Sequence, residues 1–211
     1  SLLPQYRGAA PINWAIINGE KQTGVTTFML DEQIDTGSIL FQESCLIEDY
    51  DNVGSLHDKL QAIGAKLVVR TIEAIRDRTV KPVAQDTTYL KLRPAPKIHR
   101  ETCKIDWSMS ARKIVLLIRG LSPYPTAFTF LKKDGEEPVQ LKIFFAEKMT
   151  LDSPAVPGTI LTNGKDYLAI ATADGALSLK DIQLAGKKRM DIKTFLLGFR
   201  EPESYICVNT L

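Results

Sequence analysis

The stretch at residues 1–12 reads Ser1-Leu2-Leu3-Pro4-Gln5-Tyr6-Arg7-Gly8-Ala9-Ala10-Pro11-Ile12, and the interpretation of the whole sequence starts from it. Leu2 and Leu3 are typical of a strand that ends in a hydrophobic core. Pro4 then ends the strand, because proline has no N–H to donate to a neighbouring strand. The opening therefore predicts the exit of a strand into a loop, followed by a short helix over residues 8–18.

Two strand-like runs and one long helix follow this opening. Gly24–Leu30 and Ile39–Ile47 have the composition of strands, and Asp35-Thr36-Gly37 separates them. Asp51 or Asn52 can then cap a long helix, which ends before Pro82. We therefore expect residues 1–84 to be part of an α/β domain.

Residues 85–104 have no hydrophobic periodicity. Pro94 and Pro96 lie inside this segment, and Pro82 lies just before it. Proline favours an extended backbone and excludes a continuous helix. The segment is therefore predicted to link two domains.

The sequence pattern of residues 105–211 is typical of a β domain. Ser108 or Ser110 can cap a helix, and Gly120 follows its last apolar residues. About five short strands come next, and several are separated by Asp-Gly or Asn-Gly pairs that favour tight hairpins. This number of strands predicts an all-β barrel of the oligonucleotide-binding (OB) type. The expected strands are Thr126–Leu131, Val139–Ala146, Gly158–Leu161, Tyr167–Thr172 and Ala176–Leu184.

The composition is that of a cytoplasmic protein without a membrane span. No apolar run is long enough to cross a bilayer, and the start of the chain does not resemble a signal peptide. The three widely spaced cysteines fit neither a disulfide framework nor a zinc site, so we expect reduced thiols. Residues 91–133 contain ten Lys or Arg and only two acidic residues, which suggests a polyanionic partner.

The opening stretch, continued by Thr23-Gly24-Val25-Thr26 and Ile34-Asp35-Thr36-Gly37, resembles the folate-dependent formyltransferase family. Three blocks in the same order and at the family's spacing are far more specific than one glycine motif. The resemblance implies a partial Rossmann-like fold for residues 1–84. It also implies 10-formyltetrahydrofolate as the co-substrate, a folate pocket lined by Ser1, Leu2, Leu3 and Pro4, and Asp35 as the catalytic aspartate.

Formyl transfer needs a group like Asp35. An amine attacks the formyl carbon, the oxyanion of the tetrahedral intermediate needs hydrogen-bond donors, and the nitrogen must lose a proton. A carboxylate can orient an imidazole or a water that takes this proton. Without the flanking motifs, the simpler interpretation of Asp35-Thr36-Gly37 is a turn in which the aspartate bonds the backbone.

The family's catalytic asparagine and histidine lie a few residues before the Ser-Leu-Leu-Pro block, so this chain does not contain them. Neither His57 nor His99 matches the missing position, and both are expected at the surface. We therefore expect the 211 residues to be an inactive fragment. Exposed sheet surface in residues 1–60 would then favour self-association.

The second half resembles the C-terminal domain of methionyl-tRNA formyltransferases. The resemblance rests above all on Gln183-Leu184-Ala185-Gly186-Lys187-Lys188-Arg189-Met190, and also on Ile105-Asp106-Trp107. It implies initiator methionyl-tRNA as the acceptor, with Lys187, Lys188 and Arg189 contacting phosphates. Three neighbouring basic residues are otherwise most simply a solvated cluster.

Two alternatives stay open at this point. The acceptor could be a purine-pathway amine or an amino sugar, since such relatives share the first half alone. The chain could also be a non-catalytic tRNA-binding fragment. No metal is implied, because no His or Cys at ligand spacing joins the acidic pairs.

Overall fold

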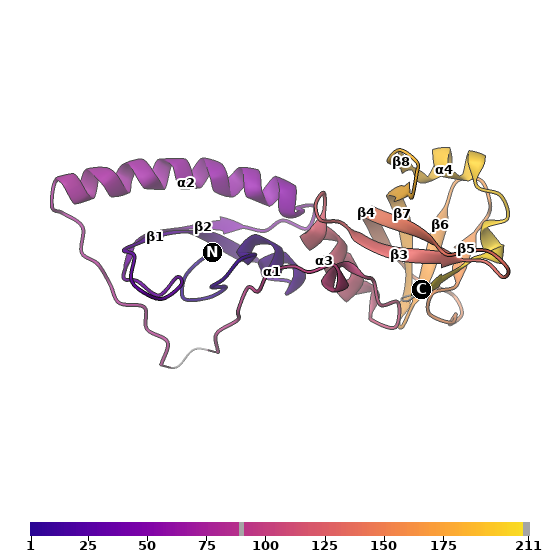
Figure 1. Cartoon of the computed structure of the whole chain (residues 1–211), viewed down its shortest axis with the longest axis horizontal. Coiled ribbons are helices and arrows are strands. Elements are labelled where there is room, and N and C mark those ends of the chain that lie inside the picture. Colours follow the sequence, from indigo (N-terminus) through magenta and orange to yellow (C-terminus); the bar gives the residue numbers. More distant parts are fainter. Residues whose placement is uncertain (89–90, 209–211) are drawn as a thin grey trace. The chain divides into compact units, whose positions relative to one another are not determined.

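The computed structural model describes residues 1–88 and 91–208 (Figure 1). The chain forms two compact units, Ser1–Ile98 and His99–Leu211.

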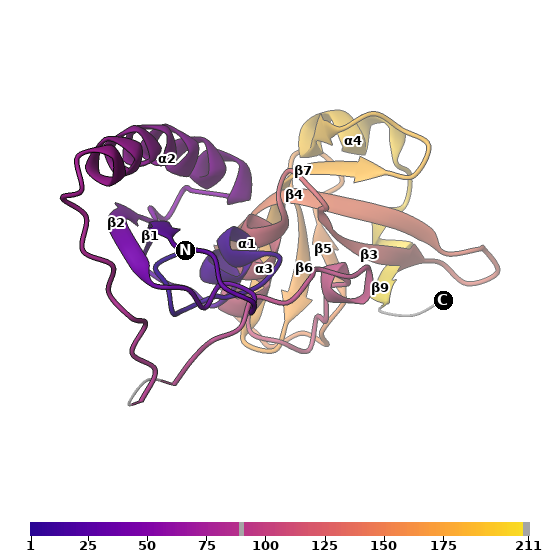
Figure 2. The same ribbon diagram turned by 60° about the vertical axis from the view of Figure 1, so that its left-hand side comes forward.

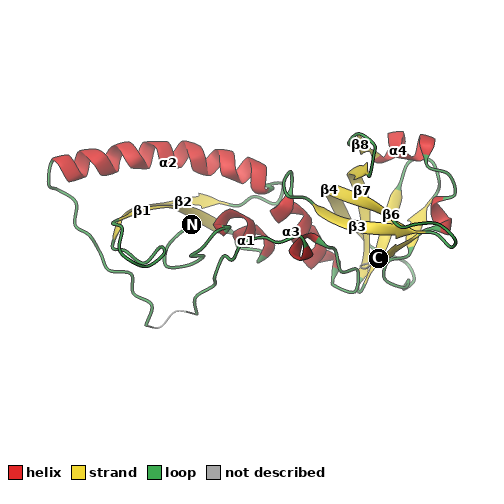
Figure 3. Cartoon of the chain, in the orientation of Figure 1, coloured by secondary structure: helices red, strands yellow, loops and turns green. Residues whose placement is uncertain are grey.

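The first unit is a β-hairpin with one long helix packed on it. Helix α1 (Pro11–Ile17) precedes strands β1 (Gln22–Phe28) and β2 (Ile39–Leu46), and helix α2 (Val53–Arg76) follows. β1 and β2 pair antiparallel from Gln22↔Leu46 to Phe28↔Ile39. Figure 3 shows α2 lying along this hairpin. The expected mixed α/β composition is confirmed, but the parallel pairing of a Rossmann-like sheet is absent among the described strands, because the 29–38 loop turns the chain back on itself.

Helix α2 begins where its cap predicts. The Asn52 side chain accepts from the Ser55 N–H, and the Ser55 hydroxyl accepts from the Asn52 N–H, which satisfies two donors at the helix start. Leu56 and Leu60, one turn apart, are buried on the same face of the helix. They share a core with Ala15, Ile16 and Ile47, and this core fixes α2 against the hairpin.

The segment that follows α2 packs back onto the first unit. The N–H and C=O of Val83 both bond Ile39, at distances of 2.9 and 2.8 Å. Further on, the Ala95 N–H bonds the carbonyl of Arg7, and the Ala95 carbonyl accepts from the Ala10 N–H. Much of the segment expected as a linker is therefore held beside residues 5–10.

The second unit is an antiparallel sheet that nearly closes into a barrel, seen from two sides in Figures 1 and 2. Its strand order is β5-β6-β7-β4-β3-β9, with β8 paired to β7. A bridge between Thr159 and Ile206 joins the two ends of this order. The strands are β3 (Ala127–Lys132), β4 (Val139–Met149), β5 (Ile160–Thr162), β6 (Leu168–Thr172), β7 (Gly175–Leu184), β8 (Met190–Asp191) and β9 (Ile206–Val208).

Helices accompany the barrel, so the unit as a whole is not all-β, and the helix expected after Ser108 or Ser110 is present. Helix α3 (Ala111–Leu121), capped by Ser110, packs against β3, β4 and β7. Ile114, Ile118 and Leu121 are buried, because this face of the helix covers apolar sheet surface that would otherwise be exposed to solvent. Helix α4 (Ile192–Gly198) follows β8, and short 3₁₀ turns lie at Glu101–Cys103 and Pro202–Ser204.

Trp107 belongs to this core. It is 2% exposed, and its indole N–H donates to the Thr129 hydroxyl at 3.0 Å. No helix among residues 1–88 and 91–208 is both long and apolar enough to cross a membrane.

Candidate functional site

The segment from Ser1 to Pro4 is held against the hairpin by its backbone. The Leu3 N–H donates to the Thr26 hydroxyl at 3.2 Å, and that hydroxyl donates to the Ser1 carbonyl at 2.7 Å. The side-chain amide of Gln42 donates to the Leu3 carbonyl at 2.8 Å. Strands β1 and β2 thus each supply a side chain that fixes this segment.

Close contacts around Gly24 explain why the Thr-Gly-Val-Thr block needs a glycine. A Cβ at this position would lie 2.2 Å from the Glu43 carbonyl oxygen and 2.5 Å from a methyl group of Leu2. The Leu2 side chain therefore occupies the space that a larger residue would take, and the first two sequence blocks meet there.

Asp35 lies on the loop between β1 and β2 and reaches back to the opening segment. Its Oδ2 accepts from the Gly8 N–H at 3.0 Å, and its backbone is left-handed, with φ of 59°. The carboxylate does bond a backbone group, as the simple turn interpretation requires, but that group is 27 residues away. Among the described residues, Oδ1 makes no hydrogen bond to protein. The structure therefore brings Asp35 against Gly8 of the opening stretch.

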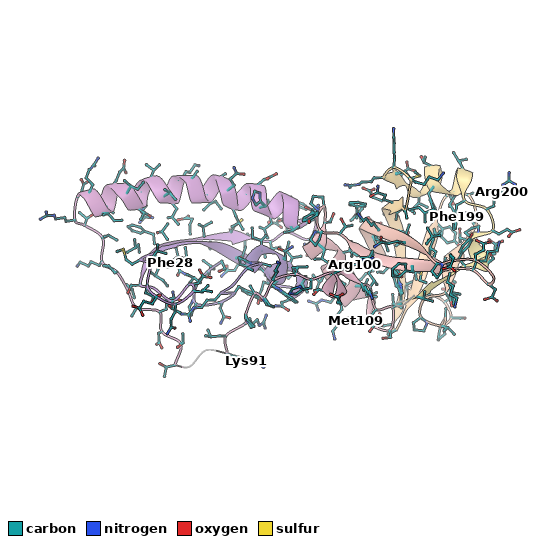
Figure 4. The ribbon with its side chains drawn as sticks, in the orientation of Figure 1. Phe28, Lys91, Arg100, Met109, Phe199 and Arg200 are labelled. Carbon is teal, nitrogen blue, oxygen red and sulfur yellow. The ribbon has the colours of Figure 1, made fainter. Side chains whose placement is uncertain are left out.

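The loop that carries Asp35 is closed at its base and braced inside. The Met29 N–H donates to the Ser38 carbonyl at 2.9 Å, and the Thr36 hydroxyl donates to the Asp31 carboxylate at 2.7 Å. Phe28, labelled in Figure 4, lies where β1 enters this loop.

Gly37 is the position in this loop that tolerates no side chain. A Cβ there would lie 1.6 Å from the Met29 carbonyl oxygen, which is backbone and cannot swing away. We expect Gly37→Ala to shift the loop and destabilise the first unit by about 1–3 kcal/mol. Urea unfolding followed by tryptophan fluorescence would measure the loss. Gly64→Ala is the control, because a Cβ there meets only side-chain methyl groups at 3.7 Å or more. Equal stability of the two variants would contradict the prediction.

A second polar cluster, which the sequence did not reveal, holds the opening segment from the other side. The buried Tyr6 donates its hydroxyl proton to Glu20 at 2.6 Å, and Asn18 donates to the Tyr6 hydroxyl at 3.3 Å. Arg93 forms an ion pair with Glu20. Burial, and then the bond to Glu20, raise the pKa of Tyr6. Local pattern gives no signal for this cluster, since its members come from separate parts of the chain.

The three basic residues expected to contact RNA, Lys187, Lys188 and Arg189, lie on the β7–β8 hairpin but have different roles. Arg189 donates to both carboxylate oxygens of Asp181, and its guanidinium lies 4.1 Å from the centre of the Phe144 ring. Lys187 and Lys188 are exposed, and neither forms an ion pair with a described residue. The Gln183 amide donates to the Lys187 carbonyl at 3.0 Å and shapes the loop. Arg189 is exposed as well, so the two lysines differ from it in that their charges are not paired with a described carboxylate.

A shallow pocket of about 190 Å³ lies at the base of this hairpin. Lys142 from β4 contributes to its wall, so the positive charge of the hairpin extends onto the sheet. The lining residues are Gln140, Lys142, Gln183, Leu184, Ala185 and Gly186.

The remaining chemistry-bearing residues do not assemble into a site. Within residues 1–88 and 91–208, no three His, Cys, Asp or Glu side chains are arranged to hold a metal ion. His57 and His99 are exposed, as expected.

Two family models match the chain, one for each unit. The formyl transferase model matches residues 1–72, and the model of the formyl transferase C-terminal domain matches residues 97–200. The chain therefore belongs to the formyltransferase family.

The similar relatives are methionyl-tRNA formyltransferases. The chain is 50% identical over 207 residues to the methionyl-tRNA formyltransferase of Bacteroides thetaiotaomicron, which covers 97% of this chain and 64% of the relative. It is 54% identical over 202 residues to the methionyl-tRNA formyltransferase of Azobacteroides pseudotrichonymphae, covering 94% of this chain and 62% of the relative. The chain thus spans less than two thirds of the length of these curated relatives.

A solved structure shares the fold of both units. The crystal structure of HypX from Aquifex aeolicus in complex with tetrahydrofolic acid matches 92% of this chain and 33% of its own, with a TM-score of 0.66 and 22% identity.

Proposed function

We propose that these 211 residues are part of a cytoplasmic methionyl-tRNA formyltransferase. The enzyme would transfer the formyl group of 10-formyltetrahydrofolate to the amino group of methionyl initiator tRNA. One observation carries the proposal: relatives of that name are about half identical to this chain across both of its units.

On the folate side, we assign the pocket to Ser1, Leu2, Leu3 and Pro4. Their backbone is fixed by hydrogen bonds from Thr26 and Gln42, so the segment can present a defined surface to a flat ring. Leu2 and Leu3 supply apolar lining, and a ligand pocket of this kind needs few polar groups beside it.

Asp35 is the catalytic residue that this chain contributes. The methionyl amine attacks the formyl carbon and forms a C–N bond, and the tetrahedral intermediate collapses when the bond between that carbon and the folate nitrogen breaks. The attacking nitrogen loses a proton, and the folate nitrogen gains one. Since Oδ2 of Asp35 is engaged by Gly8, Oδ1 is the oxygen that can orient the proton acceptor.

The asparagine and histidine that the family resemblance implies before Ser1 would supply the oxyanion donor and the proton acceptor. The 211 residues alone are therefore proposed to be inactive.

On the RNA side, we assign the barrel to the tRNA body, as an OB-type module. Lys187 and Lys188 would contact phosphates, which position an RNA without reading its sequence. Arg189 was expected to contact RNA as well. Its guanidinium is occupied by Asp181 and Phe144, so we propose that it shapes the hairpin that carries the two lysines.

The assay compares this chain with the same chain extended upstream to the full length of its relatives. We expect the extended protein to formylate methionyl initiator tRNA from 10-formyltetrahydrofolate, and the 211 residues to bind the tRNA without formylating it. Transfer to an amino-sugar nucleotide or a purine-pathway amine, with no transfer to tRNA, would replace the proposed acceptor. Transfer to none of these would favour a non-catalytic tRNA-binding protein.

Two further expectations remain proposals. The domain boundaries at 84 and 105 would be tested by limited proteolysis. Self-association through residues 1–60 would be tested by light scattering, where a monomer would contradict it.

A further inference from the structure

The side-chain amide of Gln85 joins two segments that the proposed active site needs. Its Nε2 donates to the carbonyls of Asp35 at 2.9 Å and Gly37 at 2.8 Å. Its Oε1 accepts from Nη2 of Arg7 at 2.7 Å and from Nε of the same guanidinium at 3.3 Å. One amide therefore touches the loop of Asp35 and the residue next to Gly8.

Backbone pairing between Val83 and Ile39 places Gln85 beside the Asp35 loop. Val83 pairs antiparallel with Ile39, the first residue of β2. In an antiparallel pair, two residues forward on one strand face two residues back on the other. Gln85 is thereby set opposite Gly37, although the two residues are 48 positions apart in the sequence.

A primary amide has two donor hydrogens and an acceptor oxygen with two lone pairs. Gln85 uses all of them, two toward the loop and two toward Arg7. Glutamate could keep the bonds from Arg7 but could not donate to the loop carbonyls. Leucine, of similar size, could make none of the four.

The same amide controls both ends of the bond that orients Asp35. The Gly8 N–H, which donates to Oδ2 of Asp35 at 3.0 Å, follows Arg7 directly in the chain. Gln85 holds Arg7 on one side and the Asp35 backbone on the other. If this bridge is lost, the Asp35 loop loses its side-chain link to Arg7, and the direction of the Gly8–Asp35 bond is less constrained.

We infer that Gln85 is a positioning residue for formyl transfer: it fixes Asp35 relative to the Arg7-Gly8 segment and so sets the direction of the catalytic carboxylate. The inference rests on the proposed role of Asp35. A displacement of about 1 Å at such a group can lower kcat on the order of a hundredfold without weakening binding.

Gln5 provides the matched control. Its side-chain amide also joins the opening segment to the region after α2, because Nε2 donates to the Lys91 carbonyl at 3.3 Å and Oε1 accepts from the Arg93 N–H at 2.9 Å. It makes no hydrogen bond to the Asp35 loop among the described residues. Gln5→Leu therefore removes a similar bridge without touching Asp35.

The first measurement uses the 211-residue chain and does not depend on activity. Amide hydrogen exchange would be compared in the wild type, Gln85→Leu, Gln85→Glu and Gln5→Leu. We expect exchange at Gly8 to be faster by about tenfold in both Gln85 variants, because its acceptor is no longer held. The Ile105 amide, bonded to the Phe128 carbonyl in the second unit, serves as the internal reference. Unchanged exchange at Gly8 in both Gln85 variants would overturn the inference.

The second measurement uses the full-length enzyme and separates kcat from KM. We expect Gln85→Leu and Gln85→Glu to lower kcat by about ten- to a hundredfold with little change in KM for the folate donor, and Gln5→Leu to change neither parameter. Asp35→Asn, assayed in parallel, tests the catalytic role separately. If Asp35→Asn is inactive while the Gln85 variants keep wild-type kcat, the positioning role is refuted. If Asp35→Asn is fully active, the proposed role of Asp35 fails instead, whatever the exchange data give.

Discussion

Replacing Asp35 with asparagine in the full-length enzyme is expected to lower kcat for formyl transfer by about 10²- to 10⁴-fold, the usual contribution of a group that assists proton transfer. The folate pocket should still bind its ligand, because Ser1 to Pro4 are held by Thr26 and Gln42 and not by Asp35. KM for the donor should therefore stay within a few-fold of the wild type.

Asp35→Asn should leave the fold intact, which makes the loss of activity interpretable. Asparagine tolerates the left-handed backbone at this position, and its carbonyl oxygen can still accept from the Gly8 N–H. Asp31→Asn is the matched control, since it removes a charge from the same loop while an oxygen remains to accept from Thr36. Steady-state kinetics with unchanged melting temperatures would test the prediction. A fully active Asp35→Asn enzyme would exclude the carboxylate from catalysis.

Reversing the charges of Lys187 and Lys188 is expected to weaken binding of initiator tRNA by about ten- to a hundredfold near 0.1 M salt. Both side chains are exposed and free of ion pairs with described residues, so their substitution by glutamate should cost little stability. Loss of phosphate contacts also reduces the counterions released on binding. The dependence of affinity on salt should therefore become shallower, by about one to two in the logarithmic slope.

The control for this double variant changes the net charge equally elsewhere on the barrel. Lys148 pairs with Leu177 near the start of β7, and Lys165 lies in the β5–β6 turn, so Lys148→Glu with Lys165→Glu leaves the hairpin at the end of β7 unchanged. Filter binding across a salt series would compare the two proteins. Equal losses of affinity would show that overall charge matters and that the hairpin is not a specific contact.

Much of the secondary structure could be predicted because its signals are local. α2 starts after Asn52 and α3 after Ser110, and each of these residues is one of the two caps that the sequence offered. The five expected strands of the barrel unit all exist, because alternating apolar residues between Asp-Gly and Asn-Gly turns specify hairpins without help from distant residues.

The features that could not be predicted depend on distant partners. The strands β8 and β9 have two and three residues, too few for any pattern, and exist because β7 and β3 pair with them. The two strand-like runs at β1 and β2 did not by themselves indicate the direction in which they pair, which is antiparallel from Gln22↔Leu46 to Phe28↔Ile39.

In the candidate site, too, residues with local signals could be predicted and residues that depend on distant partners could not. Asp35 and the opening segment could be found because their residues form contiguous blocks. Gln85 and Arg93 could not, because a glutamine or arginine in a proline-containing segment looks like any other polar residue until the fold brings it to its partner. Arg189 was assigned to RNA for the converse reason: sequence shows its charge, while the structure shows that Asp181 balances it.

Cys207 lies on β9, at the seam where the bridge between Thr159 and Ile206 joins the two ends of the strand order. The Cys207 N–H donates to the Gly158 carbonyl across the seam, and burial raises the pKa of the Cys207 thiol far above its ordinary value. Only the deprotonated sulfur reacts with alkylating reagents, so Cys207 is shielded while the ring of strands is shut. The rate at which it is labelled therefore reports how often the thiol becomes exposed, whether by local opening at the seam or by unfolding of the whole unit.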